Sequence, residues 1–323
     1  MSKAKTETKA NKSQEVNDKA KQALEDTLIG FLTAKNDIKN SQDFKRFLAI
    51  TANNYNYSLG NLCLILSQKP EASIVKSYKD WQKVFEQTNS DKAYIKKGSG
   101  IMIRVPMYKK IDPDIKKGDP EYERNKRSFF GTGYVFDISD IENFDHDTQF
   151  LKRYNVNQDT QAMTDLYSKL KSEALKLDII RSITEAELDP DLGGYARNTG
   201  LKTDLEEPIS DIVINQAKTD SDKLRTLAHE LTHAMLHIGK ASKTKAELQT
   251  TESSHIRSIF ESEAESVAYI VSQHIGLTSD DSLIYVASWE GDKSICESSI
   301  KRILVTAKTI INMLEFESEN TEA

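Results

Sequence analysis

The sequence has few cysteines and no long apolar run. Its 323 residues include only two cysteines, Cys63 and Cys296, which are far apart and lack metal-ligand spacing. This argues against a disulfide framework or a cysteine-ligated metal, and both thiols are interpreted as small buried groups in a reducing compartment. The longest candidate apolar run, residues 62–66, is far shorter than the roughly 18 residues of a membrane span.

An apolar signal region is also missing from the N-terminal segment, which is rich in Lys, Glu, Asn and Gln. We therefore expect a cytoplasmic protein with no membrane partner. Hydrophobic residues make up 38% of the chain and charged residues 29%, as in globular proteins that have a substantial core. Because the length exceeds the usual size of one domain, two domains are expected.

Charge is distributed unevenly along the chain. Residues 1–130 contain 25 lysines and arginines against 16 acidic residues, a net charge of +9, and the remainder carries −15, so the formal total is −6. The basic part could contact phosphates, whereas the acidic part would repel them.

The most informative motif is the H-E-x-x-H pattern at residues 229–233. On a helix, His229 and His233 share one face and can reach a single ion, with Glu230 beside them as a general base. The pattern arises by chance in about one such chain in a hundred. Capping residues at 219–222, an apolar helical pattern and Gly239 place it inside a helix, and the apolar residues fall on the opposite arc from the histidines. The motif therefore predicts a metal site and hydrolytic chemistry.

A catalytic zinc usually takes three protein ligands and keeps one position for water. Glu261, Glu263 and Glu265 lie on a second predicted helix downstream. Glu263 falls within the apolar arc of that helix, where a carboxylate is costly unless it is paired or bound to a metal. Glu263 is therefore predicted as the third ligand of one zinc ion (Zn2+) per chain.

Other polar side chains near the motif have weaker interpretations. Glu261 and Glu265 fit solvated flanking charges, with a contact to a ligand imidazole as the alternative for both. The identity of the third ligand stays open among Glu261, Glu263 and Glu265. His237 points the right way but lies two turns from His229, so it is expected behind the ligands or at the cleft rim. His255 is an alternative ligand, and Tyr195 an alternative contact to the oxyanion.

The basic half contains side chains of the kind that bind single-stranded DNA. Aromatic faces stack on bases, and cations contact the phosphate backbone. The same residues also fit a core or a solvated turn. The candidates are Tyr55, Tyr57, Trp81, Lys96, Lys97 and Arg104.

The expected architecture is α+β with two domains. Residues 1–19 are predicted to be disordered or a frayed helix, and residues 20–138 to form a mixed helix and strand domain that binds single-stranded DNA. The two strands expected near residues 95–107 and 128–138 are joined by a charged loop. A linker is expected at residues 139–160, followed at 161–323 by a mainly helical zincin-like domain with one short strand at 211–215.

Several segments resemble the ArdC antirestriction family. Three segments are similar to its N-terminal single-stranded-DNA-binding domain: NYSLGNLCLILSQKPEASIVKSYKDWQK at residues 56–83, IKKGSGIMIRVP at 95–106 and YVFDIS at 134–139. Three later segments resemble its C-terminal zinc metallopeptidase domain, which is related to ImmA/IrrE-type peptidases. They are LAHELTHAMLH at 227–237, EAESVAY at 263–269 and YVASW at 285–289. The resemblance covers about residues 25–316. It implies the same roles for His229, Glu230, His233 and Glu263, and a protein of a plasmid or other conjugative element that protects entering DNA from restriction.

Three hypotheses of different class remain. The first is a DNA-binding antirestriction protein with a zinc site, the second an ImmA/IrrE-like metallopeptidase that cleaves a repressor protein, and the third a DNA-binding module whose metal only stabilises the fold. Glu230 favours catalysis, because a structural site needs no base. In the expected mechanism, zinc lowers the pKa of a water molecule, Glu230 takes its proton, and a peptide carbonyl is attacked. Neither the peptide substrate nor a DNA sequence preference follows from the sequence.

Overall fold

The computed structural model of the chain describes residues 2–33, 38–111, 126–145, 161–238, 251–277 and 292–315. Its contacts divide the chain into two units, residues 1–27 with 57–145, and residues 28–56 with 146–323. The boundaries expected from the sequence differ, because residues 28–56 join the second unit and residues 139–145 the first. Three of the expected segments lie outside the described residues. They are the remainder of the linker (146–160), most of the charged loop (112–125) and the YVASW segment.

The chain begins with a long helix, α1 (Ser2–Thr33), where a disordered or frayed segment is expected over residues 1–19. Val16, Ala20 and Ala23 are buried at positions i, i+4 and i+7 of this helix. Such spacing places the three apolar side chains on one face, which explains why the helix has a buried side.

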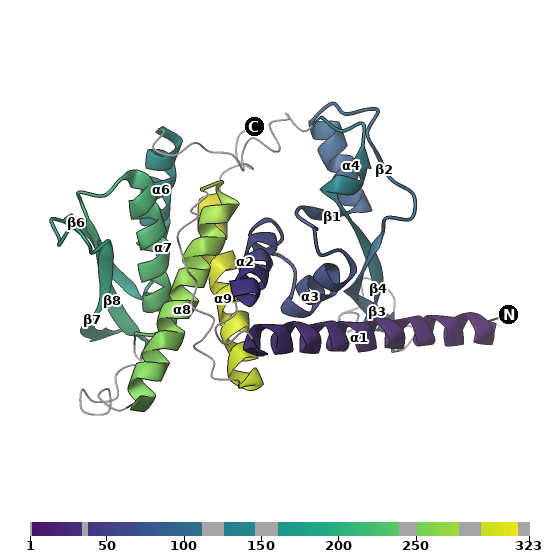
Figure 1. The fold of residues 1–323 in the computed structure, drawn as a ribbon, viewed down its shortest axis with the longest axis horizontal. Helices are drawn as coiled ribbons and strands as arrows, with labels where there is room; N and C mark the ends of the chain where they lie inside the picture. The colour runs from purple at the N-terminus through teal and green to yellow at the C-terminus, as the bar shows by residue number, and fades with distance from the viewer. Residues whose placement is uncertain are drawn as a thin grey trace. The chain divides into compact units, whose positions relative to one another are not determined.

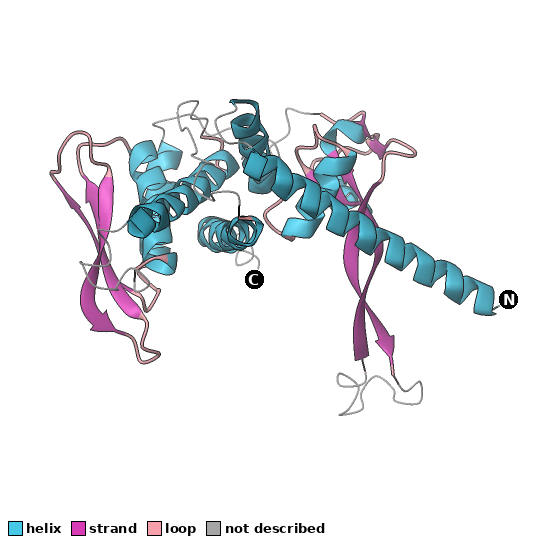
Figure 2. Cartoon of the chain, turned by 60° about the horizontal axis from the view of Figure 1, so that its bottom comes forward, coloured by secondary structure: helices cyan, strands magenta, loops and turns pink. Residues whose placement is uncertain are grey.

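The first unit contains a three-stranded antiparallel sheet in the order β1-β4-β3, made of β1 (Val75–Ser77), β4 (Lys126–Asp137) and β3 (Ile101–Lys110). Figure 2 shows β3 and β4 as a long twisted two-stranded ribbon. β2 (Tyr94–Ile95) pairs with β5 (Ile141–Glu142), and the 3-10 turn η1 (Ile138–Asp140) connects β4 to β5. The expected pair of strands is thus present as a hairpin.

Helix α3 (Leu59–Gln68) protects the edge of β3. Ser58 caps this helix, and the side-chain amides of Asn61 and Gln68 lie on it two turns apart. The Gln68 amide exchanges two hydrogen bonds with the backbone of Met102, and the Asn61 amide exchanges two with the backbone of Arg104, all at 2.8–3.0 Å. These amides satisfy peptide groups that an edge strand otherwise offers to another chain.

The core of the first unit is centred on helix α4 (Tyr78–Gln87), which Ser77 caps. Trp81, Val84 and Phe85 form its buried face at i, i+3 and i+4. The Trp81 indole is fully buried, its N–H donates to the Phe136 carbonyl at 2.8 Å, and its ring packs on Phe85 and Phe144.

The second unit contains a mixed three-stranded sheet in the order β6-β8-β7. The central strand β8 (Pro208–Asn215) pairs in parallel with β6 (Ile180–Ala186) and antiparallel with β7 (Gly194–Lys202). Residues 210–215 of β8 are all buried, which agrees with the strand expected at 211–215. Strands β6 and β7 were not expected from the sequence.

Helices cover this sheet in layers, as Figure 1 shows from β7 and β8 through α7 and α8 to α9 and α2. α7 (Asp220–Leu236) packs on β7 and β8, on α6 (Gln161–Ala174) and on α8 (Thr251–His274). α8 packs on α9 (Lys293–Glu315) and on α2 (Ile38–Asn53). Both units combine helices with sheets, as the α+β class requires. Within the described ranges, no helix has the length and apolar character needed to cross a bilayer.

Candidate active site

The H-E-x-x-H motif lies on α7, as its spacing and flanking residues predict. Thr219 caps the helix, and its hydroxyl accepts a hydrogen bond from the Asp222 N–H at 3.2 Å. His229 and His233 are one turn apart, and their Nε2 atoms are separated by 3.0 Å. In this geometry the lone pairs of both imidazoles can reach one cation.

Glu261 of α8 completes the cluster. Its carboxylate oxygens lie 3.5 Å from His229 Nε2 and 3.6 Å from His233 Nε2. Ligand atoms around a tetrahedral zinc, with bonds of about 2.0–2.1 Å, are separated by about 3.3 Å. The three side chains therefore have the donor types and the separations that fit a divalent cation.

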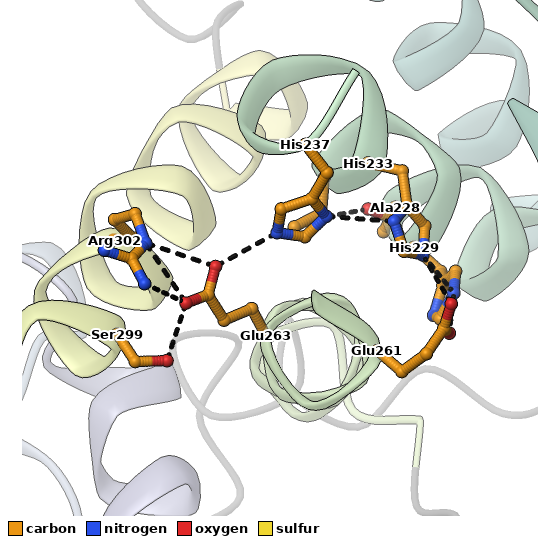
Figure 3. A network of polar contacts seen from close by, with 9 residues as sticks. Ala228, His229, His233, His237, Glu261, Glu263, Ser299 and Arg302 are labelled. Atoms are coloured by element: carbon orange, nitrogen blue, oxygen red, sulfur yellow. Dashed lines mark hydrogen bonds and ion pairs between the residues drawn. The ribbon is translucent and has the colours of Figure 1, made fainter. Parts of the chain in front are cut away.

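Glu263, the third ligand expected from the sequence, points elsewhere. Its carboxylate is fully buried and accepts hydrogen bonds from Ser299 and Arg302 of α9 and from His237. Residues two apart on a helix point about 200° apart, so Glu261 and Glu263 leave α8 on different sides (Figure 3). The buried charge is thus compensated by a guanidinium rather than a metal, and the candidate ligand is Glu261.

His237 and Glu265 lie directly behind the two histidines, in the positions considered for them from the sequence. His237 Nδ1 is 2.9 Å from His233 Nδ1, and Glu265 Oε1 is 3.3 Å from His229 Nδ1. Arg225 holds the second oxygen of Glu265 at 2.9 Å. Polar groups in such positions orient imidazole ligands and raise their basicity.

Glu230 lies beside the histidine pair, with only 7% of its surface exposed. Burial raises the pKa of Glu230, against the opposing effect of His229 and His233, and its carboxylate accepts a hydrogen bond from the backbone N–H of Ala196 on β7. A carboxylate with a raised pKa is suited to general base catalysis near neutral pH. A cleft of about 440 Å³ opens beside it, lined mainly by polar residues: Asp191, Leu192, Gly193, Gly194, Lys218, Asp222, Arg225, Thr226, His229, Glu230, Glu261 and Glu265.

Charges within the cluster are strongly coupled. Burial opposes protonation of His229, yet its hydrogen bonds to Glu261 and Glu265 outweigh burial and raise its pKa to about 9. The neighbouring imidazoles of His229 and His233 hold the pKa of Glu261 well below its usual range, and the hydrogen bond from His229 lowers the pKa of Glu265. A concentration of carboxylates that stabilises a positive charge on a buried imidazole also favours a divalent cation there.

Two glycines allow β7 to approach the motif helix. A Cβ atom at Gly194 would lie 2.6 Å from the Val213 carbonyl oxygen and 2.9 Å from the Thr226 side chain. A Cβ atom at Gly193 would lie 2.8 Å from the Thr226 hydroxyl. These positions need glycine for close packing, and the adjacent pair at 193–194 is the sequence signal for them.

Of the three aromatic residues expected to stack on DNA bases, one is fully buried and two are partly exposed. Trp81 lies in the core, so its proposed stacking role is wrong. Burial, with a contribution from Asp80, raises the pKa of Tyr57 to about 12. Tyr55 belongs to the second unit, where its hydroxyl donates to Glu315 and its ring packs edge-on against His274.

The cationic candidates of the first unit remain near its surface. Lys96 and Lys97 are exposed in the turn after β2, and the Arg104 guanidinium lies 4.4 Å from the centroid of the Phe130 ring. The exposed aromatic side chains of this unit were not among the residues expected from the sequence. They include Tyr78, Tyr94, Tyr108, Phe129, Phe130 and Tyr134.

The two remaining alternatives receive no support from the geometry. Tyr195 lies on β7 with 36% of its surface exposed, paired in register with Val213. His255 lies on α8 and is not among the ligand groups that converge within the described part of the chain.

Comparisons with known proteins agree with this description of the second unit. Residues 193–270 match the family of the IrrE N-terminal-like domain, Peptidase M78, a range that contains the motif, Glu261 and the paired glycines. An uncharacterized protein of Bacillus anthracis, pXO2-81, is 24% identical over 327 aligned residues, 94% of this chain, and the chain spans about half (52%) of that protein.

Two crystal structures of the antirestriction ArdC protein from plasmid R388 are also similar. The metal-free form is 16% identical with a TM-score of 0.40, and the match covers 80% of this chain and 85% of that one. The Mn(II)-bound form is 15% identical with the same TM-score, and the match covers 80% and 84%. The ArdC-like and IrrE-like resemblance expected from the sequence is therefore found again in these comparisons.

Proposed function

We propose that the second unit is a zinc-dependent peptidase centre built on its IrrE N-terminal-like domain. One observation carries the proposal: His229, His233 and Glu261 converge on one point beside the buried carboxylate of Glu230. Two imidazoles and one carboxylate are a ligand set of catalytic zinc, which keeps a position open for water. A purely structural site would be closed by a fourth protein ligand and would not need an adjacent base.

The residues divide the chemistry of peptide hydrolysis between them. A bound zinc ion would supply Lewis-acid activation of a water molecule and of the peptide carbonyl. Glu230 would accept a proton from that water and deliver it to the leaving amine. The hydrogen bond from Ala196 holds the Glu230 carboxylate toward β7. His229, His233 and Glu261 hold the cation, and Glu265 and His237 fix the imidazole rings.

The substrate class follows from the cleft beside Glu230. Side chains of both signs line it, including Asp191 and Asp222 against Lys218 and Arg225. Such a surface suits a polar peptide segment better than an apolar small molecule. A repressor protein, as the ImmA/IrrE resemblance implies, is one substrate of this class.

Glu230→Gln is the variant that tests the peptidase proposal. It removes the base but no ligand, so zinc affinity and thermal unfolding should stay close to those of the native protein. Cleavage of a peptide library by the zinc-loaded protein, read by mass spectrometry, should fall at least 100-fold. Loss of zinc from this variant would contradict the role of Glu230. Absence of cleavage by the zinc-loaded native protein would favour a structural metal.

For the first unit we propose binding of single-stranded DNA, within the antirestriction role on a mobile element that the sequence resemblance implies. Arg104, Phe130 and Tyr134 lie on one face of the β3–β4 ribbon, where Arg104 is in register with residue 132. Phe130 is 47% exposed and Tyr134 is 56% exposed. Exposed aromatic faces beside a guanidinium form a surface on which successive bases can stack.

Phe130→Ala and Tyr134→Ala test this surface. Each should weaken binding of single-stranded oligonucleotides by about 1–3 kcal/mol, with little dependence on sequence. Lys96→Ala with Lys97→Ala should instead reduce the slope of affinity against the logarithm of salt concentration. Tyr195→Ala, an exposed aromatic residue of the second unit, serves as the matched control. Unchanged binding in both ribbon variants would contradict the proposed surface.

A further inference from the structure

Behind the candidate zinc ligand His233, a series of four hydrogen-bonded polar side chains leads to α9, and three of them, His237, Glu263 and Ser299, are buried. His233 contacts His237, His237 contacts Glu263, and Glu263 contacts Arg302 and Ser299, as Figure 3 shows. The hydrolysis proposed above uses only the contact between His237 and His233, and it assigns no role to Glu263, Ser299 or Arg302. Glu263 and His237 are 0% and 3% exposed, so their hydrogen bonds are formed away from bulk water.

The direction of each hydrogen bond follows from the far end of the chain. Arg302 and Ser299 donate to Glu263, so Glu263 is a carboxylate that can only accept. His237 Nε2, at 3.0 Å from Glu263 Oε2, must therefore carry the hydrogen. A neutral imidazole with hydrogen on Nε2 has its acceptor on Nδ1. That atom faces His233 Nδ1 at 2.9 Å, so His233 Nδ1 must be the donor.

We propose that His237 and Glu263, anchored on α9, are positioning residues that select the cation-binding tautomer of His233 and fix its ring. With hydrogen on Nδ1, the lone pair of His233 is on Nε2, the atom that faces His229 and Glu261. The opposite tautomer would present an N–H to the cation site. This inference rests on the proposed zinc centre and extends its supporting contacts to α9.

The surroundings of His237 restrict its ring to one orientation. Its imidazole stacks on Phe260 with 4.2 Å between ring centroids and 14° between planes. Its backbone N–H donates to the His233 carbonyl at 2.9 Å, so backbone and side chain both hold it against His233. Groups that orient a ligand imidazole in this way typically affect metal affinity 10–100-fold.

Three substitutions of His237 separate the hydrogen bond from packing. His237→Phe keeps a ring on Phe260 but offers His233 no acceptor, so the full-length protein should bind Zn2+ about 10–100-fold more weakly in a competition titration. His237→Asn and His237→Leu have nearly the same shape, but only Asn offers an acceptor atom close to the position of Nδ1. Asn should therefore retain more of the zinc affinity than Leu.

His274→Phe is the matched control, because His274 is another buried histidine of the second unit, hydrogen-bonded to the Ala52 carbonyl and to Glu315. It should leave zinc affinity unchanged. Thermal unfolding of each variant in a chelator separates loss of fold from loss of zinc affinity.

The possible results distinguish the two claims. Native protein that binds no Zn2+ would contradict the zinc centre itself. Zinc affinity of His237→Phe within twofold of the native value would overturn only the positioning role. If the Phe variant does not fold, the Asn and Leu pair decides, and equal zinc affinities in that pair overturn the proposal.

Discussion

His229 shows how the metal-free site depends on protonation. Burial alone would lower the pKa of His229, but Glu261 and Glu265 raise it from 6.5 to about 9. Because the folded value is above the unfolded one, the stabilisation is complete below pH 6.5 and is lost as pH rises through about 9. In a chelator, thermal stability should therefore decline between these values more steeply for the native protein than for His229→Gln. Equal pH profiles of the two proteins would contradict this coupling.

The choice between Glu261 and Glu263 shows what the sequence can predict at single residues. Helical spacing was sufficient to place His229, Glu230 and His233 on one helix, because the motif is local. The cost of a buried carboxylate indicated that the charge of Glu263 is compensated, but the metal ion predicted for that role is replaced in the structure by Arg302. That cost could not identify the partner, because Arg302 is 39 residues away and only the packing of α8 on α9 brings the two together.

Within the sheet of the second unit, Asp211 of the central strand connects all three strands. Its buried carboxylate accepts hydrogen bonds from Arg181 of β6 and Arg197 of β7. Asp211→Asn should reduce the free energy of unfolding by about 1–2 kcal/mol in urea, at the low end because both guanidinium groups are exposed. The exposed Asp204→Asn is the control, and equal effects of the two changes would contradict the role of Asp211.

The stabilisation by Asp211 depends on pH with the opposite sign to the stabilisation by His229. Hydrogen bonds from Arg181 and Ser182 lower the pKa of Asp211 below 3.8. The stabilisation is therefore complete above the unfolded value and is lost only as pH falls through the lower folded value. The difference in free energy of unfolding between the native protein and Asp211→Asn should stay constant from pH 5 upward.

Elements with clear local signals could be predicted, and elements without them could not. α7 has a capping residue and an apolar stripe, whereas most residues of β7 are exposed or partly exposed, which leaves no apolar alternation to detect. For Trp81, sequence patterning does not distinguish a stacking aromatic from a core aromatic. Val84 and Phe85 are buried on the same face of α4, which places Trp81 in the core.

At the scale of the whole chain, residues 28–56 belong with the second unit. α2 packs on α8, and Phe31, Phe44 and Phe47 form an aromatic cluster with ring centroids 5.0–6.4 Å apart. The apolar face of α2 predicts burial but does not say against which part of the chain. The domain boundary therefore could not be placed from the sequence.

Phe47→Ala tests the assignment of this segment. Removing a side chain that is 1% exposed should reduce stability by about 3–5 kcal/mol, and the loss should appear in the unit that contains α7 and α8. Hydrogen exchange should show faster opening of α8 and little change in the β3–β4 ribbon. Faster exchange confined to residues 57–145 would contradict the division.

The central claim, that His229, His233 and Glu261 hold one divalent cation, is tested most directly by zinc content. Native protein, Glu261→Ala and the exposed control Glu207→Ala would be exposed to Zn2+, dialysed and analysed by mass spectrometry of the metal. The native protein and the control should each retain about one zinc per chain, and Glu261→Ala less than about a tenth of that. A full zinc content in Glu261→Ala, or none in the native protein, would contradict a cation site formed by these three residues.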